Sequence, residues 1–350
     1  MTPMTRPAPA EHGFCMPAEW APHQATWISW PHNPETWPGC LEAAEDAMAQ
    51  AVAALAGGET VRINVLDAAH ETHVRGRLGP LADTPAVVFH HFPTNDAWCR
   101  DHGAIFVRNE AGDLAAVDCT FNAWGGKYLP WELDDAIAAR MAESLGLARY
   151  EGGMVLEGGS IEVNGAGALL TTEQCLLNPN RNPELPRAEI ERRLALLFGV
   201  REVLWLGEGI VGDDTDGHID DITRFVAEDT VVTVVEPDSA DPNHAPLAEN
   251  LARLKTMRLA GERPLRIIEL PMPAPLEREG ERLPASYGNF YIGNEVVLLP
   301  VFGQDSDAQA ARILADCFPG RRIVPIRANE LVVGLGAFHC LTQQVPVGAS

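Results

Sequence analysis

Four strand–turn–strand segments recur along the 350-residue chain, and their regular spacing restricts the fold more than any other feature. They begin near residues 105, 161, 222 and 291, so neighbouring segments are 56 to 69 residues apart. Their turns are rich in Asn, Asp and Gly, as is typical of tight β-hairpins. The predicted hairpins are 103–107 with 114–119, 160–163 with 168–172, 222–226 with 230–235, and 289–292 with 295–300.

Helices are predicted close to these hairpins from apolar spacing and alanine content. Strands at the two ends of the chain, 25–30 and 331–336, would complete a fifth unit. Repeated α/β modules of this kind predict a ring in which the starts of the units meet at one central end. The predicted helices are 41–56, 133–145, 186–198, 247–257 and 308–317.

Composition limits the class of protein. Residues 16–350 are predicted to form a single domain behind a loose tail at 1–15, because no linker divides the chain. A net charge of −23 disfavours nucleic acid and anionic membranes as partners and favours cationic ligands. The seven cysteines include no CxxC pair, and no signal peptide or membrane span is recognisable. We therefore expect a cytoplasmic protein without disulfides.

Polar residues precede the predicted hairpins, where a ring would bring them together. The relevant segments are 95–103, 156–160, 212–221 and 334–344, and they supply Asp96, Glu157, His218, Asp220 and Cys340. Three carboxylates side by side require a cation, which is either a metal ion or a guanidinium group. A thiolate and an imidazole beside them favour the guanidinium, because a thiolate can attack its carbon.

These residues also have ordinary structural explanations. Arg100 and Asp101 are expected to form an ion pair, and a metal site made of His218, Asp220 and Asp96 stays open as an alternative. The tryptophans are expected in the core or in a pocket wall. Turn or capping roles are expected for most of Asp213, Asp214, Asp216 and Asp221.

Taken together and in this order, the motifs resemble the agmatine deiminase family, within the superfamily that also includes arginine deiminases, peptidylarginine deiminases and amidinotransferases. The resemblance covers nearly the whole chain. It implies a five-bladed α/β propeller, the pentein fold. It rests on MPAEW (16–20), WISWP (27–31), NDAWCRD (95–101), EGGS (157–160), TTE (171–173), LNPNRNP (177–183), GDDTDGHID (212–220) and HCLTQQ (339–344).

The resemblance also implies a role for each residue. Cys340 attacks the guanidinium carbon, and His218 first protonates the departing ammonia and then activates water. Asp96 and Asp220 hold the guanidinium, and Glu157 orients His218 or completes the clamp. Among the tryptophans, Trp98 contacts the substrate. No metal or organic cofactor is implied, and a homodimer is common in the family.

The implied reaction converts agmatine into N-carbamoylputrescine, a precursor of putrescine. One departure from the family pattern lies before the nucleophile, where several consecutive glycines are replaced by the sequence 334–337, GLGA. This departure bears on the substrate. Deiminases of free arginine, peptidyl-arginine or another guanidino compound would share these motifs. A non-enzymatic binding protein with the same fold is the alternative from a different class.

Overall fold

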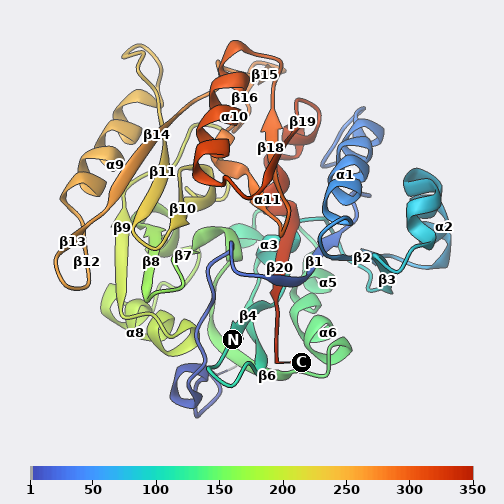
Figure 1. Cartoon of the computed structure of the whole chain (residues 1–350), viewed down its shortest axis with the longest axis horizontal. Coiled ribbons are helices and arrows are strands. Elements are labelled where there is room, and N and C mark those ends of the chain that lie inside the picture. Colours follow the sequence, from blue (N-terminus) through green and yellow to red (C-terminus); the bar gives the residue numbers. More distant parts are fainter. Residues whose placement is uncertain (1–2, 350) are drawn as a thin grey trace.

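The structure, a computed structural model, describes residues 3–349, in which four sheets share one topology (Figure 1). An antiparallel hairpin is followed by a helix and by a third strand parallel to the hairpin's second strand. A parallel neighbour requires such a crossover. These sheets are β4 (Ile105–Arg108), β5 (Leu114–Thr120) and β6 (Ala148–Val155); β7 (Glu162–Val163), β8 (Ala168–Thr172) and β9 (Glu202–Leu206); β10 (Thr223–Ala227), β11 (Thr230–Val235) and β14 (Arg266–Pro271); and β17 (Tyr291–Ile292), β18 (Val296–Val301) and β19 (Arg322–Arg327).

A further sheet joins the two ends of the chain. The strand β20 (Thr342–Pro346) pairs antiparallel with β1 (His23–Ser29), which continues in parallel through β2 (Thr60–Val65) to β3 (Val87–His91). The remaining strands form two small hairpins. These are β12 (Arg258–Leu259) with β13 (Arg263–Pro264), and β15 (Glu277–Arg278) with β16 (Glu281–Arg282).

The longer helices lie on the outside of the sheets, whereas α3 and α11 lie near the middle (Figure 1). Each outer helix buries one apolar side, as α1 does with Met48 and Val52. The outer helices are α1 (Leu41–Leu55), α2 (Ala68–Leu78), α6 (Ile137–Ser144), α8 (Arg187–Phe198), α9 (His244–Thr256) and α10 (Asp305–Cys317). Three single turns complete the set, α4 (Ala123–Gly126), α5 (Glu132–Asp135) and α7 (Glu173–Leu176).

Five short helical turns precede the first strands and contact one another in a closed cycle. Each turn contacts the next along the chain, and the last contacts the first. The starts of the units therefore meet, as the repeats predict. The turns are α3 (Cys99–His102), η3 (Gly158–Ser160), η4 (Ile219–Asp221), η5 (Tyr287–Asn289) and α11 (Phe338–Leu341).

The four hairpins and most of the helices are confirmed, but the strand predicted at 331–336 is wrong. That segment forms η6 (Leu331–Gly334) followed by Leu335 in a left-handed conformation, and β20 closes the sheet instead. Two tryptophan rings pack so closely on Gly334 and Gly336 that the segment follows their surface rather than pairing as a strand. The helix predicted at 133–145 is divided at Ala136, and α2 was not predicted.

The prediction of a loose tail is also wrong for residues 3–15. Thr5 N–H donates to Glu151 O, and Cys15 pairs with Arg108 by backbone hydrogen bonds. Phe14 packs in the core, and η1 (Pro9–His12) contacts α8. Apolar contacts and paired backbone groups fix this segment to the domain.

Among residues 3–349, no helix is both long enough and apolar enough to cross a membrane.

A buried ionic network lies where the turns meet, and Glu19 is its centre. One oxygen of the Glu19 carboxylate is 2.9 Å from Arg224 Nη2, 3.4 Å from Arg100 Nη2 and 2.7 Å from His339 Nε2. The other oxygen accepts the N–H of Ile292 at 2.8 Å. These partners come from four different units of the chain, so a single carboxylate links them.

We expect Glu19→Gln to cost about 3–5 kcal/mol of unfolding free energy, because it leaves buried arginines without their anion. Urea denaturation followed by circular dichroism measures the change. The matched control is Glu249→Gln, which removes an exposed partner of Arg253 and should change stability little. Equal midpoints for the two variants would show that the network does not hold the units together.

Candidate active site

Cys340 lies in the α11 turn, and Asn289 holds both its backbone and its thiol. The Asn289 carboxamide oxygen accepts the N–H groups of Ala337, His339 and Cys340 at 3.1–3.3 Å. Its Nδ2 is 3.0 Å from Cys340 Sγ, and Asp220 Oδ2 is 3.6 Å from the same sulfur. The thiol is therefore fixed by side chains from η4 and η5.

His218 directly precedes η4, and its side chain is fully buried beside Asp101. Nδ1 of His218 is 3.8 Å from Asp101 Oδ1. Within residues 3–349, neither ring nitrogen of His218 has a hydrogen-bond partner. The Asp101 carboxylate is itself fixed, because it accepts the Trp124 indole N–H and the Gly159 N–H, both at 3.0 Å. The acid beside the imidazole therefore has a fixed position.

Gly159 makes the close approach of these groups possible. A Cβ atom at this position would lie 2.6 Å from His218 Nδ1, 2.8 Å from Asp101 Oδ1 and 3.1 Å from Asp220 Oδ2. Glu157, two residues before Gly159, forms a fully buried ion pair with Arg181, with Oε1 2.6 Å from Nε. The EGGS motif therefore supplies both an anchored acid and the space that the other side chains fill.

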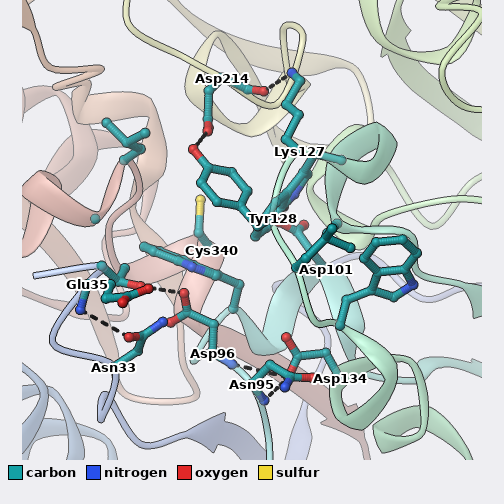
Figure 2. A pocket seen from close by; sticks show the side chains of 18 of the residues that line it. Asn33, Glu35, Asn95, Asp96, Asp101, Lys127, Tyr128, Asp134, Asp214 and Cys340 are labelled. Atoms are coloured by element: carbon teal, nitrogen blue, oxygen red, sulfur yellow. Dashed lines mark hydrogen bonds between the residues drawn. The ribbon is translucent and has the colours of Figure 1, made fainter.

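A cavity of about 690 Å³ opens onto the Cys340 sulfur. Asp96 and Trp98 line it together with Asp101 and Cys340, whereas His218, Asp220 and Glu157 are fully buried. The Asp96 carboxylate accepts the Thr36 hydroxyl at 2.5 Å and the Ala97 N–H at 2.8 Å. Figure 2 shows Asp96, Asp101 and Cys340 among the residues that line the cavity, together with the hydrogen bonds that Lys127 and Tyr128 donate to the backbone oxygen and the carboxylate of Asp214.

The surroundings control the protonation of these groups. Burial, with the carboxylate of Asp220 next in importance, raises the pKa of Cys340 well above its usual value. Burial opposes a charge on His218, but Asp101 and the neighbouring Cys175 outweigh it and raise the pKa of His218. Burial raises the pKa of Asp101 to about 6. These shifts favour a neutral thiol at Cys340 and a charged imidazole at His218 near neutral pH.

Of the predicted site residues, Cys340, His218, Asp220 and Glu157 meet through the turns, and Asp96 and Trp98 line the cavity that reaches Cys340. The ion pair predicted between Arg100 and Asp101 is wrong, since Arg100 pairs with Glu19 and Asp101 with His218. The difference arises because consecutive residues of a helical turn point in directions about 100° apart.

Asn289 and His339 were not predicted as site residues. Nδ1 of His339 is 2.6 Å from Asp220 Oδ2. Asn289 could have been recognised from its place at the start of the fourth predicted hairpin, because the other units carry site residues at the same place.

A metal site is the remaining chemical alternative. Among residues 3–349, the ligand atoms close enough to share an ion belong to Glu157, Cys175 and His218, within 4.8 Å of one another. This set differs from His218, Asp220 and Asp96, the set considered from the sequence. Because Arg181 already neutralises Glu157, the geometry favours an organic cation in the cavity over an ion in this cluster.

Comparisons with known proteins agree with this geometry. The model of the Porphyromonas-type peptidyl-arginine deiminase family matches residues 15–346. The chain is 39% identical over 369 residues to the agmatine deiminase of Ectopseudomonas mendocina (strain ymp), covering 99% of both chains. It is 38% identical over 361 residues to that of Pseudomonas aeruginosa (strain LESB58), covering 97% of both.

Solved structures are similar over the same length. The agmatine deiminase of Enterococcus faecalis has a TM-score of 0.92 and 33% identity, covering 99% of this chain and 100% of that one. An agmatine deiminase of C. jejuni with substrate bound has a TM-score of 0.88 and 31% identity, covering 96% and 97%. The chain belongs to the Porphyromonas-type peptidyl-arginine deiminase family. It is a hydrolase that acts on the C–N bonds of guanidino compounds.

Gly159→Ala should lower kcat on the order of 10²-fold, since its methyl group would displace His218 and Asp101 from the positions that catalysis requires. Steady-state kinetics with a guanidino substrate measures the loss. Gly76→Ala in α2 is the matched control, because a Cβ there meets nothing within 4 Å. Wild-type kcat in Gly159→Ala would refute the packing argument.

Alkylation of Cys340 in the free enzyme should accelerate with pH through the alkaline range, because the reactive thiolate forms only above its raised pKa. Asp220→Asn removes a negative charge beside the sulfur and should move the profile to lower pH. Mass spectrometry of the peptide containing Cys340 after timed iodoacetamide treatment measures this. Asp83→Asn on the surface serves as the control, and identical profiles for both variants would contradict the assignment.

Proposed function

We propose that the protein is an agmatine deiminase that hydrolyses agmatine to N-carbamoylputrescine and ammonia through a covalent intermediate on Cys340. One observation carries the proposal. A thiol held by Asn289 faces a cavity lined with carboxylates, and one of these, Asp101, lies 3.8 Å from the buried imidazole of His218. This combination suits attack on the carbon of a bound guanidinium.

Asp96 and Asp220 hold the guanidinium, since planar N–H groups pair with carboxylates. Asp220 is ready for this role because burial, although it favours the neutral acid, is outweighed by His339, which lowers the pKa of Asp220. The bound cation also favours ionisation of the neighbouring Cys340 thiol. Substrate binding therefore generates the thiolate that the free enzyme lacks, and the thiol proton is released to solvent.

In the first half of the reaction, the Cys340 thiolate forms a C–S bond to the guanidinium carbon. His218, charged in the resting site, gives its proton to one terminal nitrogen, and the C–N bond breaks to release ammonia. Asp101 stabilises the imidazolium before this transfer, at 3.8 Å from Nδ1. An amidino-thioether remains on Cys340.

In the second half, neutral His218 takes a proton from a water molecule that attacks the same carbon. The C–S bond then breaks, and the carbon keeps the new oxygen as the carbonyl of N-carbamoylputrescine. The sulfur leaves as a thiolate and takes up the proton that remains on the new oxygen, so the neutral thiol is restored, and His218 is charged again. Dividing the displacement in two lowers each barrier, and this chemistry calls for no metal or cofactor.

The charge of the cavity supports agmatine over free arginine. Its lining includes five acidic residues, Glu35, Asp96, Asp101, Asp134 and Asp214. The one lysine of the lining, Lys127, is already paired with Asp216 at 2.9 Å. Surplus negative charge attracts a dication and repels the carboxylate that arginine carries.

The domain architecture and the oligomeric state belong to the same proposal. We place residues 16–350 in one catalytic domain whose sheets form the blades of a five-bladed α/β propeller, and the closed cycle of turns supports this arrangement. We also propose a homodimer, in line with the family resemblance.

Cys340→Ser should abolish turnover while the fold stays intact, a loss on the order of 10⁴-fold or more. Mass spectrometry of products from agmatine, L-arginine and an arginyl peptide, each with and without EDTA, measures activity and identifies the substrate. Cys317→Ser, at a half-buried cysteine of α10, is the matched control and should keep wild-type activity.

The outcomes separate the alternatives. Turnover of arginine or the peptide instead of agmatine would keep the mechanism and change the substrate. Activity that EDTA removes would favour a metal hydrolase. Silence on all three substrates would favour a binding protein.

A further inference from the structure

Leu335 adopts a backbone conformation that leucine normally avoids. Its φ of 72° and ψ of 21° place it in the left-handed region, between η6 and α11. A residue other than glycine is strained there, because its Cβ atom comes too close to the following carbonyl oxygen. Strain of this kind persists where the surrounding structure enforces it, and it is concentrated at functional sites.

Two tryptophans enforce this conformation. A Cβ at Gly334 would lie 2.8 Å from the Trp37 ring, and a Cβ at Gly336 would lie 2.6 Å from Trp98 Cζ3. The two indole rings are 5.5 Å apart, and Trp37 Nε1 donates to Leu331 O at 2.8 Å. The backbone on both sides of Leu335 therefore packs tightly against the two indole rings, so the chain changes direction at Leu335.

The strained residue faces the active-site cavity. Leu335 is partly buried and lines the cavity together with Val333 and Gly334. Its neighbour Gly336 is so close to the nucleophile that a Cβ there would lie 3.2 Å from Cys340 Sγ. A branched apolar residue is thus part of the wall of a cavity whose charged groups are mostly acidic.

Carboxylates recognise the charged ends of a substrate, but an apolar side chain can contact only the carbon chain between them. A leucine fixed beside that chain fills the space that a substituent on the chain would need. A glycine would adopt the same backbone conformation without strain and would leave this space empty. The leucine therefore costs stability and, in return, shapes the cavity.

We propose that Leu335 is a specificity-determining residue that packs against the methylene spacer of the substrate and selects unbranched ω-guanidinoalkylamines. Guanidino acids, which carry an amino and a carboxylate group on one carbon, are rejected by its side chain as well as by the negative charge of the cavity. This inference rests on the proposed function. It assigns to the wall of the same site the discrimination between agmatine and arginine.

The test compares Leu335→Gly and Leu335→Ala with the wild type, using agmatine, its homologues with one methylene fewer and one more, and L-arginine. Loss of an apolar contact in a pocket typically changes kcat/KM by 10-fold or more. We expect the ratio of kcat/KM for agmatine over arginine to fall at least 10-fold in both variants. The preference for one spacer length should also become weaker.

Glu262→Gly is the matched control. Glu262 also has a left-handed φ, of 60°, but lies on the exposed turn between β12 and β13. Both glycine variants relieve strain and should raise Tm, whereas only the change at Leu335 should alter selectivity. A selectivity ratio within two-fold of wild type in folded Leu335→Gly and Leu335→Ala would overturn the proposal while leaving the proposed function standing.

A second readout does not depend on turnover. Agmatine and arginine are compared for their ability to protect Cys340 from iodoacetamide in the wild type and in each variant. If the wild type turned over neither compound, weaker discrimination in protection would still support a specificity role for Leu335. Unchanged discrimination, or no protection by any guanidino compound, would overturn it.

Discussion

The carboxylate of Glu19 is buried where the units of the chain meet, and the rest of the structure depends on the charged side chains that pair with it. It is in contact with Arg100 of α3, Arg224 of β10 and His339 of α11. Removing one partner from such a network leaves an uncompensated buried charge. The network therefore fixes how neighbouring units are positioned, and the candidate site residues lie in or beside the helical turns that precede their sheets.

The same network reaches the nucleophile through His339. The imidazole joins Glu19 to Asp220 with distances of 2.7 and 2.6 Å, and Asp220 lies 3.6 Å from Cys340 Sγ. The charge that stabilises the fold thus orients an acid of the site. Burial and these acids raise the pKa of the thiol, and in the proposed mechanism a bound cation would lower it again.

Local patterns predicted the hairpins well because turn residues and apolar runs act over a few residues. They failed where distant packing decided the result. The segment 331–336 has the apolar composition of a strand, but two tryptophan rings from other parts of the chain impose a helical turn and a left-handed leucine on it. Asp101 follows an arginine in sequence and was paired with it, although the turn of α3 directs the two side chains to different partners.

The sequence alone determined the repeated α/β units and most of the chemistry, since a cysteine, a histidine and three acids lie at the starts of those units. Only the tertiary structure decided which further groups join them. Asn289 on the thiol, Asp101 on the imidazole and Leu335 on the cavity wall are each set by contacts between segments far apart in sequence. Such contacts depend on how the sheets pack, and hydrophobic periodicity within one segment carries no information about them.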